Sequence, residues 1–186
     1  MSDRRHDLAE AATDYVLEHG LLDLSLRPLA AALGTSDRML LYHFKDKLDL
    51  VATVLNVSNA RSVRGIRELR PSRDVRQAVV DLWGVVSKPE QARCQRLYVE
   101  AAALGVLGAE PFATVVGEAN EVWTQAVVDH LVASGTPRER GRRAVALLDA
   151  ALMGFQLDLP LDAGDPVLEQ AVLDLADAVA AIACQV

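Results

Sequence analysis

The sequence contains few of the residues that carry out chemistry in small proteins. Its 186 residues include two cysteines and four histidines, and 4% of the chain is aromatic. Cys94 and Cys184 are far apart and have no metal-ligand spacing to a histidine, so neither a disulfide framework nor a metal site is predicted. There is also no Ser-His-Asp or Cys-His constellation, glycine-rich phosphate loop or supported carboxylate pair. These absences argue against an enzyme and against a cofactor.

Strand and membrane signals are scarce as well. Alternating β-branched runs and Asn-Gly or Asp-Gly turns are almost absent, while Ala, Leu and Val dominate the 51% of hydrophobic residues. The longest apolar stretches are interrupted by Glu100 and Asp149 before they reach membrane-spanning length, and no signal peptide is recognisable. The sequence therefore predicts an all-α, cytoplasmic protein with no membrane partner.

Two short helical patterns joined by a tight turn occupy residues 25–47. Ser25 is expected to cap the first helix, Gly34 to end it in the left-handed conformation, and Ser36 to cap a second helix over residues 37–43. The apolar face of the first helix recurs at helical spacing and consists of Leu26, Leu29, Ala30 and Leu33. Two helices joined by such a turn form the unit that reads DNA in many regulators.

The second helix of this pair has an unusual outward face. Leu40 and Phe44 lie one turn apart and are expected to pack on the first helix. The residues left outside are Arg38, Met39, Leu41 and Tyr42. Exposed apolar side chains are costly in water, but against DNA they contact thymine methyl groups, while Arg grips guanine and Tyr reaches a phosphate. The alternative is an ordinary helical hairpin whose second helix is covered by the rest of the chain.

The region around this hairpin resembles the DNA-binding domain of TetR-type (TetR/AcrR family) transcriptional repressors. The resemblance extends over residues 8–50 and includes an Ala-Ala pair before Gly20. It also includes a Leu-Ser-Leu-Arg-x-Leu-Ala-x-x-Leu-Gly-x-Ser run at 24–36 and a Leu-x-Tyr-His-Phe-x-x-Lys run at 40–47. By resemblance, the chain consists of a three-helix helix-turn-helix domain, residues 1–48, and a helical ligand-sensing and dimerisation domain, residues 49–186.

The resemblance implies a homodimer that binds a palindromic operator and releases it when a small-molecule inducer binds. Two residues depart from the family pattern: Leu41 stands where many members have Tyr, so an apolar contact with a base is expected there, and Val16 stands in a core position where Phe is usual. The residues expected to contact operator DNA are Arg27, Thr35, Ser36, Arg38, Met39, Leu41, Tyr42, His43 and Lys47. A helical DNA-binding protein without a ligand is the alternative function.

The net charge of −7 is unevenly distributed. From Ala144 onward there are seven acidic residues and no Lys or Arg, which places the negative end away from DNA. Residues 1–50 still have nine acidic residues against six basic ones, so affinity must come from a few well-placed cations. Arg4 and Arg5 are expected to form a flexible arm that reaches a groove. A stripe of five arginines is either a solvated helix end or a DNA contact: Arg61, Arg64, Arg67, Arg70 and Arg73.

Proline-containing breaks divide the rest of the chain into six expected helices, at residues 46–68, 73–87, 90–106, 111–133, 138–158 and 167–184. The last two are apolar over more surface than one small domain is expected to bury, which predicts a twofold four-helix interface. The interface residues expected are Ala144, Leu148, Ala151, Gly154, Phe155, Leu168, Val172, Leu175 and Val179.

A ligand pocket is expected from aromatic residues with nearby polar anchors on the middle helices. Its predicted lining is Trp83, Tyr98, Phe112, Asn120, Trp123, Asp149, Met153 and Gln156. Each of these residues taken alone is also consistent with an ordinary core position. Asp149 is the strongest candidate for a ligand contact, because a lone carboxylate on an apolar helix must be solvated, form an ion pair or bind a ligand. It either faces solvent, pairs with Arg142 or Arg143 of a second copy, or anchors a ligand together with Gln156.

Overall fold

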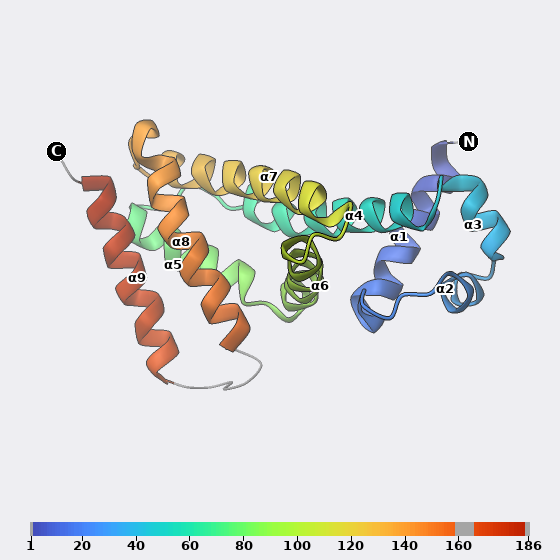
Figure 1. The fold of residues 1–186 in the computed structure, drawn as a ribbon. Coiled ribbons are helices and arrows are strands. Elements are labelled where there is room, and N and C mark those ends of the chain that lie inside the picture. The colour runs from blue at the N-terminus through green and yellow to red at the C-terminus, as the bar shows by residue number, and fades with distance from the viewer. Residues whose placement is uncertain (1, 159–165, 185–186) are drawn as a thin grey trace. The chain divides into compact units, whose positions relative to one another are not determined.

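The computed structural model describes residues 2–158 and 166–184, and every regular element in these ranges is an α-helix (Figure 1). The helices are α1 (Ser2–His19), α2 (Leu26–Ala32), α3 (Asp37–His43), α4 (Lys47–Arg67), α5 (Val75–Val86), α6 (Pro89–Val106), α7 (Phe112–Ala133), α8 (Arg138–Asp158) and α9 (Pro166–Cys184). The all-α prediction is confirmed.

The six helices predicted after the hairpin all occur, and their ends differ from the prediction by no more than two residues. Proline ends such helices because it cannot donate the backbone hydrogen bond. A second feature, side-chain capping, sets the start of α5: the Asp74 side chain accepts a hydrogen bond from Gln77 N at 2.7 Å. The break predicted between Pro160 and Pro166 lies almost entirely outside the described residues.

The described helices form two compact units. The first unit combines Met1–Ser62 with Arg93–Asn120, and the second unit combines Val63–Ala92 with Glu121–Val186. Helices α4, α6 and α7 therefore have residues in both units. The helix-turn-helix segment shares its unit with parts of these three helices, all of which lie beyond the division expected at residue 48.

The core of the first unit joins the short helices to the longer ones. Its buried side chains come from α1, α2, α3, α4, α6 and α7 and include Leu8, Val16, Leu29, Leu40, Phe44, Val54, Leu97 and Phe112. Burying each large apolar side chain contributes about 1.5–3 kcal/mol, so the three N-terminal helices depend on partners from α6 and α7 as well as on one another. Val16, which departs from the family pattern, is fully buried in this core.

The core of the second unit is built mainly from α5, α8, α9 and the later part of α7. Helix α9 packs against both α5 and α8, and α8 and α9 lie side by side in Figure 1. The fully buried side chains of this core include Ala78, Val79, Leu82, Leu131, Leu148, Ala176 and Val179. The broad apolar faces of the last two helices are thus buried to a large extent inside their own chain, where α9 packs against α5 and α8.

This packing corrects part of the expected dimer surface. Five of the residues expected there are buried inside the second unit, namely Ala144, Leu148, Val172, Leu175 and Val179. They supply no outer surface, because α9 packs against both α5 and α8 and these residues fill the core of their own chain. The remaining four are half-buried: Ala151, Gly154, Phe155 and Leu168.

Candidate nucleic-acid interface

Helix α2 is short and is held mainly by its apolar face. Leu29 and Ala30 are buried, and Pro28 lies in the first turn, where its missing N–H costs no helical hydrogen bond. Ser25 occupies the N-cap position with extended backbone angles, but its side chain makes no capping hydrogen bond. The predicted Ser25 cap is therefore present in backbone conformation only.

The turn between α2 and α3 has the predicted chemistry. Gly34 has φ +63°, a left-handed conformation that a residue without Cβ adopts readily. Thr35 N then donates to Ala30 O at 2.9 Å, which satisfies a carbonyl at the end of α2. Ser36 begins α3, and its Oγ accepts a hydrogen bond from Met39 N at 3.3 Å. The turn thus fixes the angle between the two helices through backbone and side-chain hydrogen bonds.

Helix α3 has one buried face and one open face. Leu40 and Phe44 are buried, as predicted. On the other face Arg38 is exposed, and the exposed fractions of Met39, Leu41 and Tyr42 are 44%, 44% and 67%. The second hairpin helix is therefore not covered by the described parts of the chain, and its open face combines one cation with three large, partly apolar side chains.

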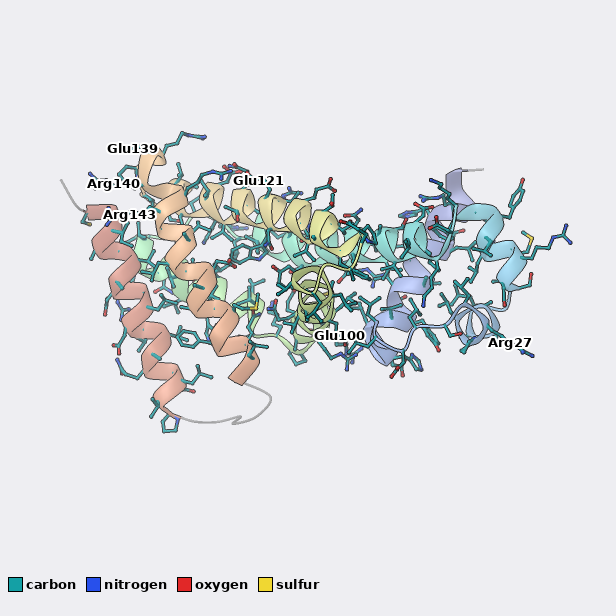
Figure 2. All side chains as sticks on the ribbon, viewed as in Figure 1. Arg27, Glu100, Glu121, Glu139, Arg140 and Arg143 are labelled. Atoms are coloured by element: carbon teal, nitrogen blue, oxygen red, sulfur yellow. The ribbon has the colours of Figure 1, made fainter. Side chains whose placement is uncertain are left out.

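The other residues expected at DNA flank this face. Arg27 projects from the first turn of α2 into the open (Figure 2). Ser36, at the N-cap of α3, is exposed as well. Thr35 and His43 are half-buried, and the His43 ring lies edge-on to the Tyr42 ring at 5.2 Å between centroids. Both rings belong to the last two residues of α3.

Lys47 has an internal role that its position in the sequence does not reveal. Its Nζ donates a hydrogen bond of 2.5 Å to Leu24 O, in the segment before α2. The same residue begins α4, so it joins the end of the α1–α2 connection to the end of the α3–α4 connection. A phosphate contact by Lys47 remains a prediction, and any such contact must share the ammonium group with Leu24 O.

Arg5 differs from the expectation of a flexible arm. It lies within α1, its Nε donates to His43 O at 3.1 Å, and its Nη2 lies 3.4 Å from Asp49 Oδ2. The guanidinium also stacks over the ring of Phe44, 4.9 Å from the centroid. Arg5 therefore holds the C-terminal end of α3, where a positive charge is favoured by the helix dipole.

The first three members of the arginine stripe lie on α4 and the last two follow it. Two of the five, Arg61 and Arg73, form ion pairs with acidic residues of the chain. Arg61 pairs with Glu10 at 2.5 Å and with Asp14 at 2.6 Å, both on α1. Burial lowers the pKa of Arg61, but the hydrogen bonds to Glu10 and Asp14 outweigh it and leave the pKa raised. Arg73 pairs with its neighbour Asp74 at 3.3 Å. Neither a solvated helix end nor a DNA contact fully describes Arg61, because its ion pairs connect α4 to α1.

The residues expected to line a ligand pocket are divided between the two units. Tyr98, Phe112 and Asn120 belong to the first unit, where Phe112 is a core residue and Asn120 is exposed. The other five belong to the second unit: Trp83, Trp123, Asp149, Met153 and Gln156. All five are half-buried in that unit. The predicted pocket lining therefore does not belong to a single compact unit.

Within the second unit the aromatic residues and the amide have specific partners. Trp83 packs edge-on against Phe155, with ring centroids 6.0 Å apart. Gln156 Nε2 donates to Val86 O at 3.0 Å, at the C-terminal end of α5. Phe155, expected at the dimer interface, thus has a contact within its own chain, and its place in a dimer remains a prediction.

Asp149 is half-buried, and the described residues provide it with neither an ion pair nor a hydrogen bond. Burial alone raises its pKa. It lies one heptad from both Arg142 and Gln156, so the three share one face of α8. Arg142 pairs with Glu121 of α7, and Gln156 bonds to α5. Asp149 therefore lies on the side of α8 that faces helices of its own chain, and Arg142 already has a partner there.

His130 is a buried polar residue whose surroundings the sequence did not reveal. Its Nε2 has no hydrogen-bond partner among the described residues, and neither does Thr136 Oγ1 nearby in sequence. Burial lowers the pKa of His130 and outweighs the opposite effects of a hydrogen bond with the Ala78 backbone and the charge of Asp81. His130 is thus held as a neutral imidazole inside the second unit.

These observations define a class of protein: an all-helical chain whose N-terminal part is a helix-turn-helix DNA-binding domain. Residues 8–54 match the family model of bacterial regulatory proteins, tetR family. This region of the chain is thus identified as a TetR-family DNA-binding domain, in agreement with the resemblance of its motifs. No curated protein matches the sequence.

Solved structures agree with this fold over nearly the whole chain. A tetR-family transcriptional regulator from Rhodococcus sp. has 22% identity and a TM-score of 0.72, with 98% of this chain and 100% of that chain covered. A regulator from Saccharomonospora viridis, solved in complex with choline, has 18% identity and a TM-score of 0.67 over 96% of each chain. The multidrug binding protein EbrR, solved with imidazole, has 24% identity and a TM-score of 0.65, with 95% of this chain and 94% of that chain covered.

The described residues contain neither a candidate membrane span nor a candidate metal site. No helix among them is both long enough and apolar enough to cross a membrane. Nor does any group of three or more His, Cys, Asp or Glu side chains there lie close enough to hold a metal ion.

Proposed function

We propose that this protein is a transcriptional repressor that binds a palindromic operator as a homodimer and is released from it by a small molecule. The observation that carries the proposal is the open face of α3, which displays Arg38 beside Met39, Leu41 and Tyr42. This face is exposed among the described residues, and it matches the guanine acceptors and the thymine methyl groups of the DNA major groove. The family model on residues 8–54 supports the same assignment.

The homodimer is proposed to form through the outer faces of α8 and α9. On α8 a seam at heptad spacing consists of Leu147, Ala150, Gly154 and Leu157. On α9 the exposed residues include Val167, Ala178 and Ala181. A Cβ added at Gly154 would meet no atom within 4 Å, so the backbone there is open to close approach by another helix. Apolar and small residues in such seams are typical of four-helix packing.

The ligand is proposed to bind near Asp149, within the predicted set of pocket residues. An unpaired, half-buried carboxylate in the same unit as the half-buried Trp83 and Trp123 favours a ligand that is positively charged and partly apolar. No Lys or Arg occurs from Ala144 onward, and Arg142 on the same face of α8 is paired with Glu121. Two of the structural relatives were solved with choline and with imidazole, which makes these compounds the first to try.

The deciding experiment measures binding of the purified protein to fragments of its own promoter region, followed by a search for compounds that release it. Binding to an inverted repeat and release by a small molecule are expected. Asp149→Asn is expected to leave operator binding unchanged and to weaken release. DNA affinity that no compound changes would favour a DNA-binding protein without a ligand. A protein that binds no fragment of its promoter would contradict the proposal.

A further inference from the structure

The last turn of α1 receives its hydrogen bonds from a distant helix. The final carbonyl groups of a helix have no partner within it and need one from elsewhere. Arg96 of α6 provides it, because its Nη2 donates to Leu17 O at 2.6 Å and to Glu18 O at 3.3 Å. A guanidinium placed there also neutralises the negative end of the helix dipole.

The backbone beyond these carbonyls presents N–H groups to a carboxylate of the same distant helix. Gly20 has φ +88°, and the N–H groups of Leu21 and Leu22 follow it. Both donate to Glu100 Oε2, at 2.5 Å and 3.2 Å. Successive N–H groups at a left-handed turn form a concave anion site, and here a side chain of the protein fills it.

Arg96 and Glu100 form one device, which we call the α1 clamp. They lie one turn apart on α6, with Arg96 Nε 3.8 Å from Glu100 Oε1, and all of their contacts lie within the first compact unit. Glu100 lies on the side of α6 that faces α1 (Figure 2), and only 16% of its side chain is exposed. The cation of the clamp binds carbonyl groups and its anion binds N–H groups, so both kinds of unpaired backbone group at this helix end are satisfied.

The α1 clamp acts on the segment that leads directly into the DNA-binding hairpin. Only a short connection separates Leu22 from the start of α2, and its Leu24 O is held by Lys47. Side chains packed on α1 and α2 leave little room for either helix to move alone. A change in the turn at Gly20 is therefore expected to shift α2 and, through it, α3.

We propose that Arg96 and Glu100 are positioning residues for operator binding: by capping α1 from α6, they fix the direction in which α2 and α3 are presented to DNA. The inference rests on the proposed function, but it concerns residues that contact no DNA. It makes α6 a structural part of the DNA-binding machinery of this chain.

The test compares Glu100→Gln and Arg96→Gln with matched variants in the same unit, Glu118→Gln and Arg93→Gln, whose parent residues are exposed. Operator affinity is measured by fluorescence anisotropy over a range of salt and with operators whose half-sites are one base pair further apart. The clamp variants are expected to bind about tenfold more weakly, equivalent to about 1.4 kcal/mol. Their salt dependence should be unchanged, because no phosphate contact is lost. Their discrimination between the two spacings should decrease.

Wild-type affinity and spacing discrimination in Glu100→Gln would overturn the proposal. A weaker affinity that is equal at both spacings, in a variant that is partly unfolded at the assay temperature, would overturn it as well. Amide exchange of Leu21 and Leu22 provides a check that needs no DNA: both should be protected in the wild type and exposed in Glu100→Gln. Absence of DNA binding by the wild type would instead contradict the proposed function, and the exchange measurement would still test the clamp.

Discussion

Arg38 stands at the second position of α3, where a recognition helix comes nearest to base edges. Replacing it with Ala is expected to weaken operator binding by about 1–3 kcal/mol and to relax the preference at one base pair, because a bidentate contact to guanine is lost. Competition binding with operators altered one base pair at a time measures both effects. Full affinity with unchanged base preference would contradict the assignment of Arg38 to a base.

Arg5 and Arg4 are neighbours with the same charge and different surroundings. Arg5 contacts His43 O, Asp49 and the Phe44 ring, whereas Arg4 is exposed. Arg5→Gln is expected to reduce the free energy of unfolding by roughly 0.5–1.5 kcal/mol, since an exposed ion pair and a cation–π contact are lost together. Arg4→Gln should leave stability unchanged. Urea unfolding of the two variants checks this, and equal stabilities would show that the Arg5 contacts are unimportant.

Individual residues also show which structural roles could be predicted from the sequence and which could not. Gly34, Ser36, Leu40 and Phe44 behave as predicted, because their roles depend on neighbours within one or two helical turns. The partners of Lys47, Arg5 and Glu100 were not predicted. Each bridges residues 23 to 79 positions apart, and no local pattern specifies such a pairing. A charged residue in a sequence shows that a charge must be accommodated, but not which backbone group accommodates it.

At the scale of helices, the boundaries were predictable and the partners of their faces were not. Proline and capping residues mark each helix end locally. An apolar stripe, however, does not distinguish a face covered by the same chain from one covered by a second copy. That is why Leu148 and Val179 were assigned to a dimer interface although both are buried in the core of their own chain. The pocket residues and the dimer interface remain predictions.

The outer seam of α8 gives a prediction about the dimer. Gly154→Arg is expected to produce monomers or aggregates and to abolish operator binding, because a long charged side chain would occupy the space needed by the second copy. Ala133→Arg, at the exposed end of α7, serves as the control and should stay dimeric. Analytical ultracentrifugation distinguishes these outcomes. A monodisperse wild-type monomer at micromolar concentration would rule out the proposed dimer.

At the scale of the whole molecule, His130 predicts a dependence of stability on pH. Its pKa in the folded protein is lowered, mainly by burial, so below the ordinary value of about 6.5 the unfolded chain binds a proton that the folded protein does not. Stability is therefore complete above this pH and decreases as the pH falls toward the folded pKa. The slope can reach about 1.4 kcal/mol per pH unit for one proton. Thermal unfolding between pH 7.5 and 5.5 measures it.

The matched variant is His130→Gln, which removes the titrating group from the same buried position. Its stability should change less than that of the wild type over this pH interval, whatever its absolute value. Identical pH profiles for the two proteins would mean that other groups cause the dependence. Because His130 lies in the second unit, such a result would leave the account of the DNA-binding face unchanged.

The α1 clamp binds main-chain atoms, and this has a consequence for how the sequence can diverge. The carbonyls of Leu17 and Glu18 would be present whatever residues stood there, and the N–H groups of Leu21 and Leu22 would be present with any residue except proline. Gly20 is restricted further, since its φ is positive and an added Cβ would lie 3.3 Å from Glu100 Oε1. A chimera that takes residues 1–62 from another regulator would therefore keep this junction, provided that glycine occupies position 20 and proline is absent from positions 21 and 22.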